Sequence, residues 1–566
     1  MTVVWLFVIF SLPFALELHA ADILGVPNSS YNGGIVFIIY DENESYILAG
    51  NISKSSYRTL SSNEREALRR AAEYWVAILL EGKNVAVNVG INTVNVNGAA
   101  NGGAISTASL QFPMGLIQGA NVEANRYHAA VEIGNITDQY YLQTNLPNAF
   151  SFESLLIHEI AHVFGLNGTQ TPKPNAYYLN QSEVAGKWYF NGTVTTQVYN
   201  DYKVGGTEKM PVDNDEIGKT GVASARAHSG VWGSLMGYGY FSNYPMLLEV
   251  ELAVFKDLGY DVYLRNFFGR SIYTSGNNLT NTVGFFRFDP LKNSYTSAPN
   301  TSIYGIGLHI FGDNNTVLQA ADIYADGSSA AGIRIDGKGN SISTGDSTIS
   351  ASGDRGTALL LAFGSNHQVL VTSSIIAAGD GGTGIRLDMG RTGSSAYIKG
   401  DTYTQSISYS HFNSNPFASN STSPYYAQFA KAIDQLKGPL ASKVNVLGSI
   451  ISGDGPYSAA IYIGPGAHVE TINIMRPNGG TTPSVTGDII TDYDIFLRSL
   501  SSTLPETNIY FGYEADKNGD PQGSPDAFFD LLIDGKILGY DASWTNHPEA
   551  SHQYIYQEQQ NDTFIG

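Results

Sequence analysis

Residues 323–337 read IYADGSSAAGIRIDG, and the same pattern returns twice further along the chain. Residues 349–364 read ISASGDRGTALLLAFG, and residues 375–390 read IIAAGDGGTGIRLDMG. The motif Ile-x-Ala-x-Gly opens all three segments, at steps of 26 residues. A period in the mid-twenties, made of short alternating strands and glycine turns, is typical of one coil of a parallel β-helix. We therefore predict stacked coils whose neighbouring strands lie about 4.8 Å apart.

A second pattern keeps the same interval and extends the repeat region. Echoes of both patterns return 76 residues later, at 451–453 and 460–461, which we interpret as three further periods. The end of the chain has the character of an irregular β-helix. A β-sandwich with chance similarity is the alternative, but several markers in phase favour the β-helix. The second pattern occurs as GLHIFG from Gly307, GIRIDG from Gly332, ALLLAFG from Ala358 and GIRLDMG from Gly384.

The composition restricts the class of protein. The chain has 566 residues, too many for one ordinary domain, so we expect at least two folded units. It is 43% hydrophobic and 14% charged, with 61 glycines and 35 tyrosines, a balance that favours turn-rich β structure. The formal net charge of -20 argues against nucleic acid as a partner, because phosphates require a basic surface. The absence of cysteine excludes disulfides, thiolate metal sites and a cysteine nucleophile.

The N-terminal segment MTVVWLFVIFSLPFALELHA has the pattern of an export signal. An apolar run from Val3 to Leu16 leads into Ala20, a small residue suited to a cleavage site, although no lysine or arginine precedes the run. The run is too short to span a membrane comfortably as a helix. We therefore predict a signal peptide over residues 1–20, a secreted protein and no transmembrane helix.

Helical and strand-like patterns mix in the segment that follows. Ser61 and Glu64 have the spacing of a capping box, and apolar residues then recur on one helical face up to residue 80. Residues 84–96 and 127–135 alternate between apolar and polar as strands do. This mixture predicts a domain with helices packed on a sheet.

A second helix is predicted over residues 152–165, where Gly165 would end it. Residues 166–229 are polar and poorly periodic, so we expect a long loop region, and loops of that length are usually functional. A last helix over residues 245–260 closes the region.

The second helix carries the motif HEIAHVFGLNG at residues 158–168. Positions i and i+4 lie on one face of a helix, so the imidazoles of His158 and His162 can reach one metal ion. Glu159 lies beside that metal position without binding it, where a general base must be to take a proton from an attacking water. The motif predicts a zinc-dependent hydrolase.

The third metal ligand is not supplied by the motif itself. The position three residues after Gly165 is Gly168, which has no side chain. Of the eleven histidines, His228 is the one left when those of the signal segment, the upstream strand and the repeats are set aside. Met236 follows it eight residues later, in the stretch SLMGY at residues 234–238.

Acidic side chains are alternative third ligands. Glu249 and Glu251 lie in the last predicted helix, where another class of zinc protease carries a glutamate ligand. That class has an aspartate four residues after its glutamate, and this chain has Ala253 and Phe255 at those positions. The long loop offers three further oxygen ligands: Asp213, Asp215 and Glu216.

Taken together, these motifs resemble the metzincin clan of zinc endopeptidases. In that clan HExxHxxG is followed by a turn whose methionine lies beneath the metal, as Met236 would here. The long spacing from His162 to His228 is similar to that of leishmanolysin-like members, in which an insertion precedes the third histidine. The resemblance implies an α/β (α+β) zinc metalloprotease domain over residues 21–262, with one catalytic zinc ion and a protein or peptide substrate.

The same resemblance assigns roles to the site residues. Glu159 would be the general base, Gly165 would let the chain turn out of the helix, and Met236 would pack below the metal. Tyr238 matches a tyrosine that, in some metzincins, moves between metal ligation and transition-state support; a buried core tyrosine is the alternative. Three histidines would hold the zinc: His158, His162 and His228.

A zinc protease domain joined to a β-helix further resembles the passengers of Gram-negative autotransporter proteins. This resemblance implies a connector over residues 263–300 and a parallel β-helix (β-solenoid) passenger region over residues 301–566. It also implies a secreted protein or one displayed on a bacterial outer surface. Export would need an outer-membrane translocation partner, or a C-terminal barrel that is missing before Gly566. The expected fold class is thus multidomain.

Two other functions compete with the peptidase. One is a β-helix adhesin or surface structural protein with an inactive protease domain, against which the retained Glu159 argues. The other is a polysaccharide-cleaving enzyme built on Asp336 and Asp388, which lie two coils, or roughly 9.6 Å, apart along the stack. A solvated ladder of arginine and aspartate side chains is the plainer interpretation of those two residues.

Overall fold

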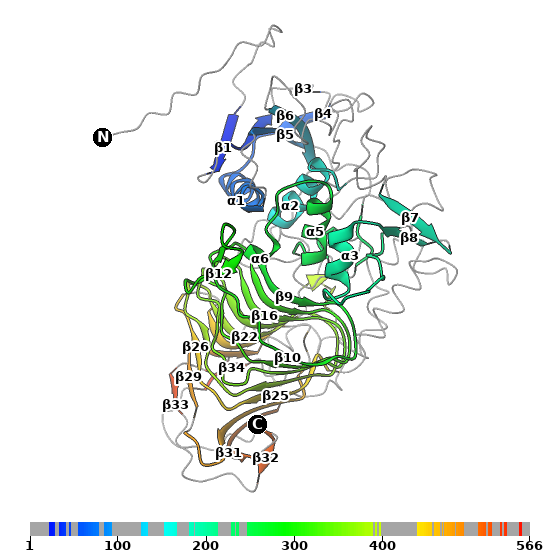
Figure 1. Cartoon of the computed structure of the whole chain (residues 1–566). Helices are drawn as coiled ribbons and strands as arrows, with labels where there is room; N and C mark the ends of the chain where they lie inside the picture. Colours follow the sequence, from blue (N-terminus) through cyan, green and yellow to red (C-terminus); the bar gives the residue numbers. More distant parts are fainter. Residues whose placement is uncertain are drawn as a thin grey trace.

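The computed structural model shows a mixed α/β chain in which a layer of sheet and helices lies at one end of a stack of coils (Figure 1). The signal segment lies outside the described residues. The structure describes residues 22–28, 33–40, 45–46, 55–78, 84–92, 126–133, 152–166, 180–185, 187–212, 228–231, 234–236, 246–388, 391–392, 396–397, 439–455, 458–464, 467, 469–481, 483–491, 508–516, 519–522, 532–534, 537–539 and 554–556.

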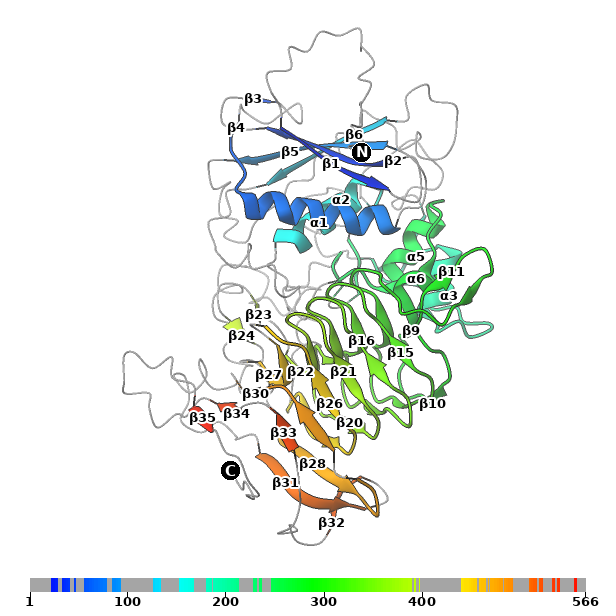
Figure 2. The same cartoon turned by 90° about the vertical axis from the view of Figure 1, so that its left-hand side faces the viewer.

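A six-stranded sheet forms the outermost layer at the N-terminal end, with the order β1-β2-β5-β4-β3 and β6 paired to β5. The strands β2, β5 and β6 run parallel, and the expected strands at 84–96 and 127–135 are confirmed as β5 and β6. Figure 2 shows α1 crossing below this sheet, with α2 behind it. The strands are β1 (Asp22–Asn28), β2 (Gly33–Tyr40), β3 (Ser45–Tyr46), β4 (Ser55–Arg58), β5 (Asn84–Asn92) and β6 (Arg126–Ile133).

Helix α1 (Ser62–Ile78) begins at the predicted capping box. The Ser61 backbone N–H donates to Glu64 Oε2 at 2.8 Å, and the Glu64 N–H donates to Ser61 Oγ at 3.3 Å. The predicted apolar face is buried, with Trp75 fully so. The Trp75 indole N–H donates to the Ile157 carbonyl at 3.1 Å, which fixes α2 against α1.

Helix α2 (Phe152–Val163) ends at Gly165, which has a φ of 110°. An L side chain rarely adopts that conformation, so glycine ends the helix as predicted. The Leu166 N–H then donates to the Ala161 carbonyl at 3.2 Å, which closes the last turn. The Tyr260 hydroxyl donates to the Phe164 carbonyl at 2.8 Å, so the end of the helix is held from the far side of the domain.

The expected loop at 166–229 is wrong for part of its length. A hairpin of β7 (Gln181–Val184) and β8 (Lys187–Phe190) is followed by α3 (Thr193–Tyr199). The Val194 and Thr195 N–H groups donate to the Asp257 carboxylate at 2.9 and 2.8 Å. Asp257 is the last residue of α5 (Glu249–Asp257), the predicted closing helix. Because the cap comes from a distant helix, local sequence could not reveal α3.

The predicted coils are present as three long sheets whose neighbouring strands run parallel, in the manner of a β-solenoid (Figure 1). The first sheet contains β9 (Phe268–Ile272), β13 (Ile306–Ile310), β16 (Ala331–Ile335), β19 (Thr357–Leu361), β22 (Thr383–Leu387), β27 (Ala459–Ile463), β30 (Ile489–Thr491) and β34 (Ile537–Gly539). The second contains β10 (Asn278–Asn281), β14 (Thr316–Gln319), β17 (Ser341–Ser343), β20 (His367–Val371), β25 (Ala441–Val446), β28 (Thr471–Pro477) and β31 (Asn508–Ala515). The third contains β15 (Ile323–Tyr324), β18 (Ile349–Ser350), β21 (Ile375–Ala377), β26 (Ile450–Ser452), β29 (Ser484–Thr486) and β33 (Leu532–Asp534).

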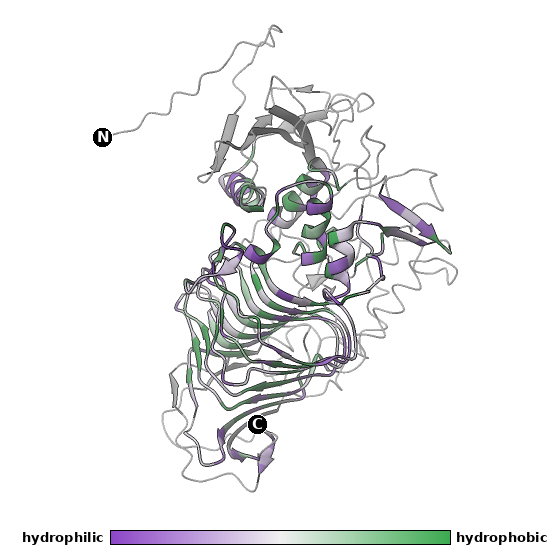
Figure 3. Cartoon of the chain, viewed as in Figure 1, coloured by the Kyte–Doolittle hydropathy of each residue, from purple (hydrophilic) through white to green (hydrophobic). Residues whose placement is uncertain are grey.

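The repeated isoleucines stack directly on one another. Ile323 pairs with Ile349, and Ile349 pairs with Ile375, so the step of 26 residues is one coil. Apolar stretches run along the strands of successive coils (Figure 3). The repeated glycine also has a steric reason: a Cβ on Gly332 would lie 2.6 Å from Ile349 Cγ2. The remaining short elements are α6 (Leu264–Phe267), β11 (Phe288–Asp289), β12 (Ser294–Tyr295), β23 (Arg391–Thr392), β24 (Ala396–Tyr397), β32 (Pro521–Gln522) and β35 (Tyr554–Tyr556).

Two sequence expectations about the coils differ from the structure. The segment expected as a connector, 263–300, contains β9 and β10, which pair with β13 and β14, so the first coil already starts at Phe268. The three further periods inferred after Ile375 are also wrong. Ile375 pairs directly with Ile450, so the coil after β21 begins there and the residues between belong to an insertion. Near the end of the chain, β31, β33 and β34 extend the three sheets, as an irregular β-helix would.

The predicted solvated ladder of arginine and aspartate is wrong because these side chains are buried. Arg334 Nε donates to Asp336 Oδ2 at 2.8 Å, and His309 Nε2 lies 2.8 Å from the same oxygen. Burial opposes ionisation of Asp336, but the Arg334 charge and the His309 hydrogen bond outweigh it and lower its pKa. A buried, ion-paired carboxylate cannot protonate a glycosidic oxygen, so the polysaccharide hypothesis loses its acid at Asp336.

The helical layer and the first coils share one hydrophobic core, which includes Tyr74 of α1 and Tyr304 and Ile306 of the solenoid. The rings of Tyr74 and Tyr304 meet edge to face at 5.4 Å. The Tyr304 hydroxyl donates to Glu153 Oε1 of α2 at 2.6 Å, and the other Glu153 oxygen accepts from Arg70 Nε at 2.6 Å. The solenoid is therefore packed against the helix that carries the histidine motif.

Within the described part of the chain, none of the helices has both the length and the apolar character needed to cross a bilayer.

Candidate metal centre

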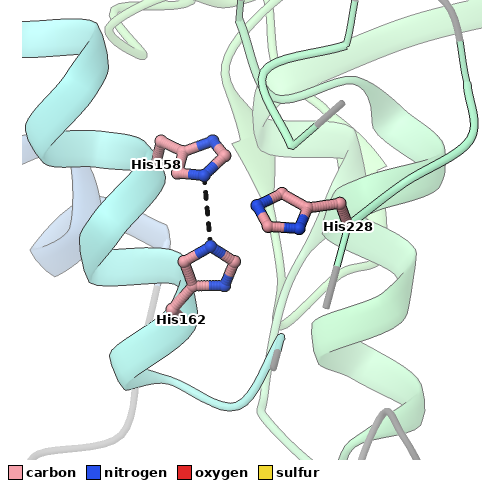
Figure 4. Close-up of side chains that lie close together, drawn as sticks. All are labelled: His158, His162 and His228. Atoms are coloured by element: carbon pink, nitrogen blue, oxygen red, sulfur yellow. Dashed lines mark hydrogen bonds between the residues drawn. The ribbon is translucent and has the colours of Figure 1, made fainter. Parts of the chain in front are cut away.

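Three histidine side chains from two distant segments converge on one point (Figure 4). His158 and His162 project from successive turns of α2, and His228 approaches from the opposite side, 66 residues after His162. One ring nitrogen of each lies within 4.8 Å of the others. His162 and His228 are buried, while His158 keeps partial exposure, so solvent reaches the cluster from its side. The three histidines therefore lie close enough to bind one metal ion.

Backbone carbonyls fix the orientation of the two helix histidines. His158 Nδ1 lies 2.7 Å from the Leu235 carbonyl oxygen, and His162 Nδ1 bonds to the Leu166 carbonyl oxygen. A carbonyl can only accept, so Nδ1 carries the proton in both rings and each Nε2 presents a lone pair. This arrangement is the one that metal-binding histidines commonly adopt.

The two Nε2 atoms lie 3.1 Å apart, along the dashed line in Figure 4. Two nitrogens bound to one tetrahedral zinc at about 2.0–2.1 Å would lie roughly 3.3 Å apart. Two lone pairs at this distance repel unless a proton or a cation lies between them. Burial and the neighbouring His158 lower the pKa of His162 to about 3, so a proton is disfavoured at neutral pH. A metal cation fits the gap instead.

Backbone pairing brings His228 to the helix. The Ser229 N–H donates to the Met236 carbonyl at 2.8 Å, and Ser229 also forms an antiparallel bridge with Val212. The segment 228–231 is thus held between the strand-like residues 211–212 and the turn at 234–236. Because that turn also supplies the carbonyl at His158, one short stretch positions two of the three histidines.

Glu159 follows His158 on α2 and is buried, with 4% of its surface exposed. Met236 is fully buried in the core beside the turn, as expected of a packed platform. Gly165 ends the helix as described above. Tyr238, Gly168 and the acidic loop residues lie outside the described residues, so their roles stay predictions: Asp213, Asp215 and Glu216.

The rival glutamate ligands are engaged elsewhere. Glu249 Oε1 accepts from Arg265 and from the Tyr202 hydroxyl, at 2.6 and 2.8 Å. Glu251 accepts from the backbone N–H groups of Leu248 and Met236. Among the residues that the structure describes, the cluster that could hold a metal is the one of three histidines, and neither glutamate belongs to it.

The carbonyl partners of the histidines, and Glu251 behind them, were not found by sequence reasoning. A carbonyl oxygen is common to every residue, so no residue type marks Leu235 or Leu166 as a partner. The short run from the turn at 234–236 to the following helix was the one available signal, because it places an acidic helix start close to the turn.

No family model matches this chain, and neither does any curated protein or any solved structure.

Proposed function

We propose that this protein is a zinc-dependent endopeptidase of metzincin type that is exported and acts on proteins outside the cell. The observation that carries the proposal is the convergence of His158, His162 and His228 beside Glu159. A ligand set made only of imidazoles suits zinc, and three protein ligands leave a coordination position open, as catalytic zinc sites require. The solenoid would present this domain away from the surface to which the protein is attached.

Each residue has a part in the proposed hydrolysis. Three neutral imidazoles hold the ion through Nε2, and the carbonyls of Leu235 and Leu166 keep the rings turned toward it. A zinc ion held there supplies Lewis-acid polarisation of the scissile carbonyl and of the attacking water. Glu159 takes a proton from that water and passes it to the leaving amine. Its burial keeps the carboxylate out of bulk water, where proton transfer would be less controlled.

Removal of the metal should abolish the activity of the full chain. A strong chelator strips the three histidines, and a stoichiometric addition of zinc should restore hydrolysis, because the ligands are already oriented by backbone contacts. The measurement is cleavage of an unfolded protein substrate such as casein, followed on gels before chelation, after chelation and after zinc addition. Magnesium in place of zinc should restore nothing, since imidazole ligands do not suit it.

Hydrolysis that continues unchanged after complete metal removal would contradict the proposal. A chain that binds zinc but cleaves no substrate would instead favour a surface protein with an inactive protease domain.

A further inference from the structure

A buried carboxylate lies behind the metal cluster, at the start of α5. Glu251 is fully buried. Its Oε2 accepts from the Leu248 N–H at 2.9 Å, and its Oε1 accepts from the Met236 N–H at 3.1 Å. The first bond caps the helix to which Glu251 belongs. The second reaches 15 residues back along the chain, to a turn that the helix does not need for its own stability.

That turn is the one that orients the histidines. The Leu235 carbonyl oxygen accepts from His158 Nδ1 at 2.7 Å. The Met236 carbonyl accepts from the Ser229 N–H, next to His228, at 2.8 Å. Met236 therefore has its N–H bound to Glu251 and its carbonyl bound beside His228. A displacement of this residue would move the contacts of two metal-binding rings together.

We propose that Glu251 is a positioning residue of the metal centre, whose carboxylate fixes the turn at 234–236 and thereby holds His158 and His228 in metal-binding orientation. This inference rests on the proposed metal site. Glu251 does not touch the metal position itself.

The surroundings of Glu251 suit a fixed acceptor. Burial raises its pKa to about 7, against the opposing effect of the backbone N–H groups that donate to it. Its place in the first turn of α5 adds the favourable field of a helix N-terminus. A side chain with two acceptor oxygens is needed, because Leu248 and Met236 lie on different oxygens.

The test compares Glu251→Gln with Glu249→Gln in the full chain. Glutamine has the same shape but one acceptor oxygen, so it must lose either the cap or the turn. Glu249 is an equally buried glutamate two residues earlier, bound to Arg265 and Tyr202 rather than to the turn, and it serves as the matched control. Zinc affinity is measured by competition with a chromophoric chelator, and ligand geometry by the visible absorption of bound cobalt(II).

We expect Glu251→Gln to weaken zinc binding by about 10-fold or more and to change the cobalt spectrum, as changes behind metal ligands commonly do. Glu249→Gln should leave both unchanged, even if it lowers the temperature of unfolding. If Glu251→Gln does not fold, Glu251→Asp tests the same point. Its shorter side chain can still cap Leu248 but falls short of Met236, so the same loss is expected.

Wild-type affinity and an unchanged cobalt spectrum in a folded Glu251 variant would overturn the positioning role and leave the metal site standing. Equal losses in the Glu249 and Glu251 variants would also overturn it, because the effect would then be general destabilisation. A wild-type chain that binds no zinc would overturn the metal site itself, and with it this inference.

Discussion

Replacing Glu159 with glutamine should reduce peptide hydrolysis by about 10²–10⁴-fold while the zinc content stays the same. The substitution keeps the size of a side chain that is 4% exposed, so the packing of α2 is preserved. It removes the one carboxylate adjacent to His158 in the motif, and an amide cannot take a proton from water at neutral pH. The measurement is kcat/KM on a fluorogenic peptide, with metal analysis of the same sample.

The matched control is Glu73→Gln on α1, whose side chain is partly exposed and bound to Arg69. This variant should keep the wild-type rate. A Glu159→Gln chain that hydrolyses peptide at the wild-type rate would show that another group acts as the base. A chain that loses zinc together with activity would show that Glu159 supports the metal rather than the proton transfer.

A fragment that ends at Val262 should fail to fold cooperatively, although the histidine motif and His228 lie within it. The core around α1 and α2 includes side chains from beyond that point, among them Phe267, Phe268, Tyr304 and Ile306. Each large apolar side chain contributes roughly 1.5–3 kcal/mol when buried. The loss of several is comparable with the entire stability of a typical domain, about 5–15 kcal/mol. Thermal unfolding followed by circular dichroism would measure the outcome.

A longer fragment that ends at Asp388 keeps the first coils and should unfold in one transition. Tyr304→Phe in the full chain isolates the hydrogen bond to Glu153, and we expect it to lower stability by about 1 kcal/mol, far less than the truncation. A sharp unfolding transition in the fragment ending at Val262 would contradict the shared core and show that the helical layer folds without the solenoid.

The coils were predictable because the spacing of isoleucines is the register of the stack. Ile323, Ile349 and Ile375 pair one upon the next, and any other spacing would break the interior row. The first coil was missed because β9 and β10 read FGRSI and NLTN, without the motif, and are strands through their pairing with β13 and β14. Length alone also misled the count after Ile375, since an insertion between coils adds residues without adding a period.

The metal cluster was predictable as far as residue type and helical spacing reach. His158 and His162 share a helix face by geometry, and His228 was left after other histidines were assigned elsewhere. The backbone contacts that orient the rings were not predictable, because they depend on how the turn at 234–236 packs against α2 and α5. The buried Arg334 and Asp336 misled in the same way, since charge suggests exposure until a partner such as His309 is known.

The central claim is that three histidines hold one zinc ion, and it is tested most directly by zinc per chain in the full-length protein and in its His228→Ala variant. Metal analysis after removal of loosely bound ions should give about one zinc in the parent and little in the variant. Equal zinc in the two proteins, or none in either, would contradict the account.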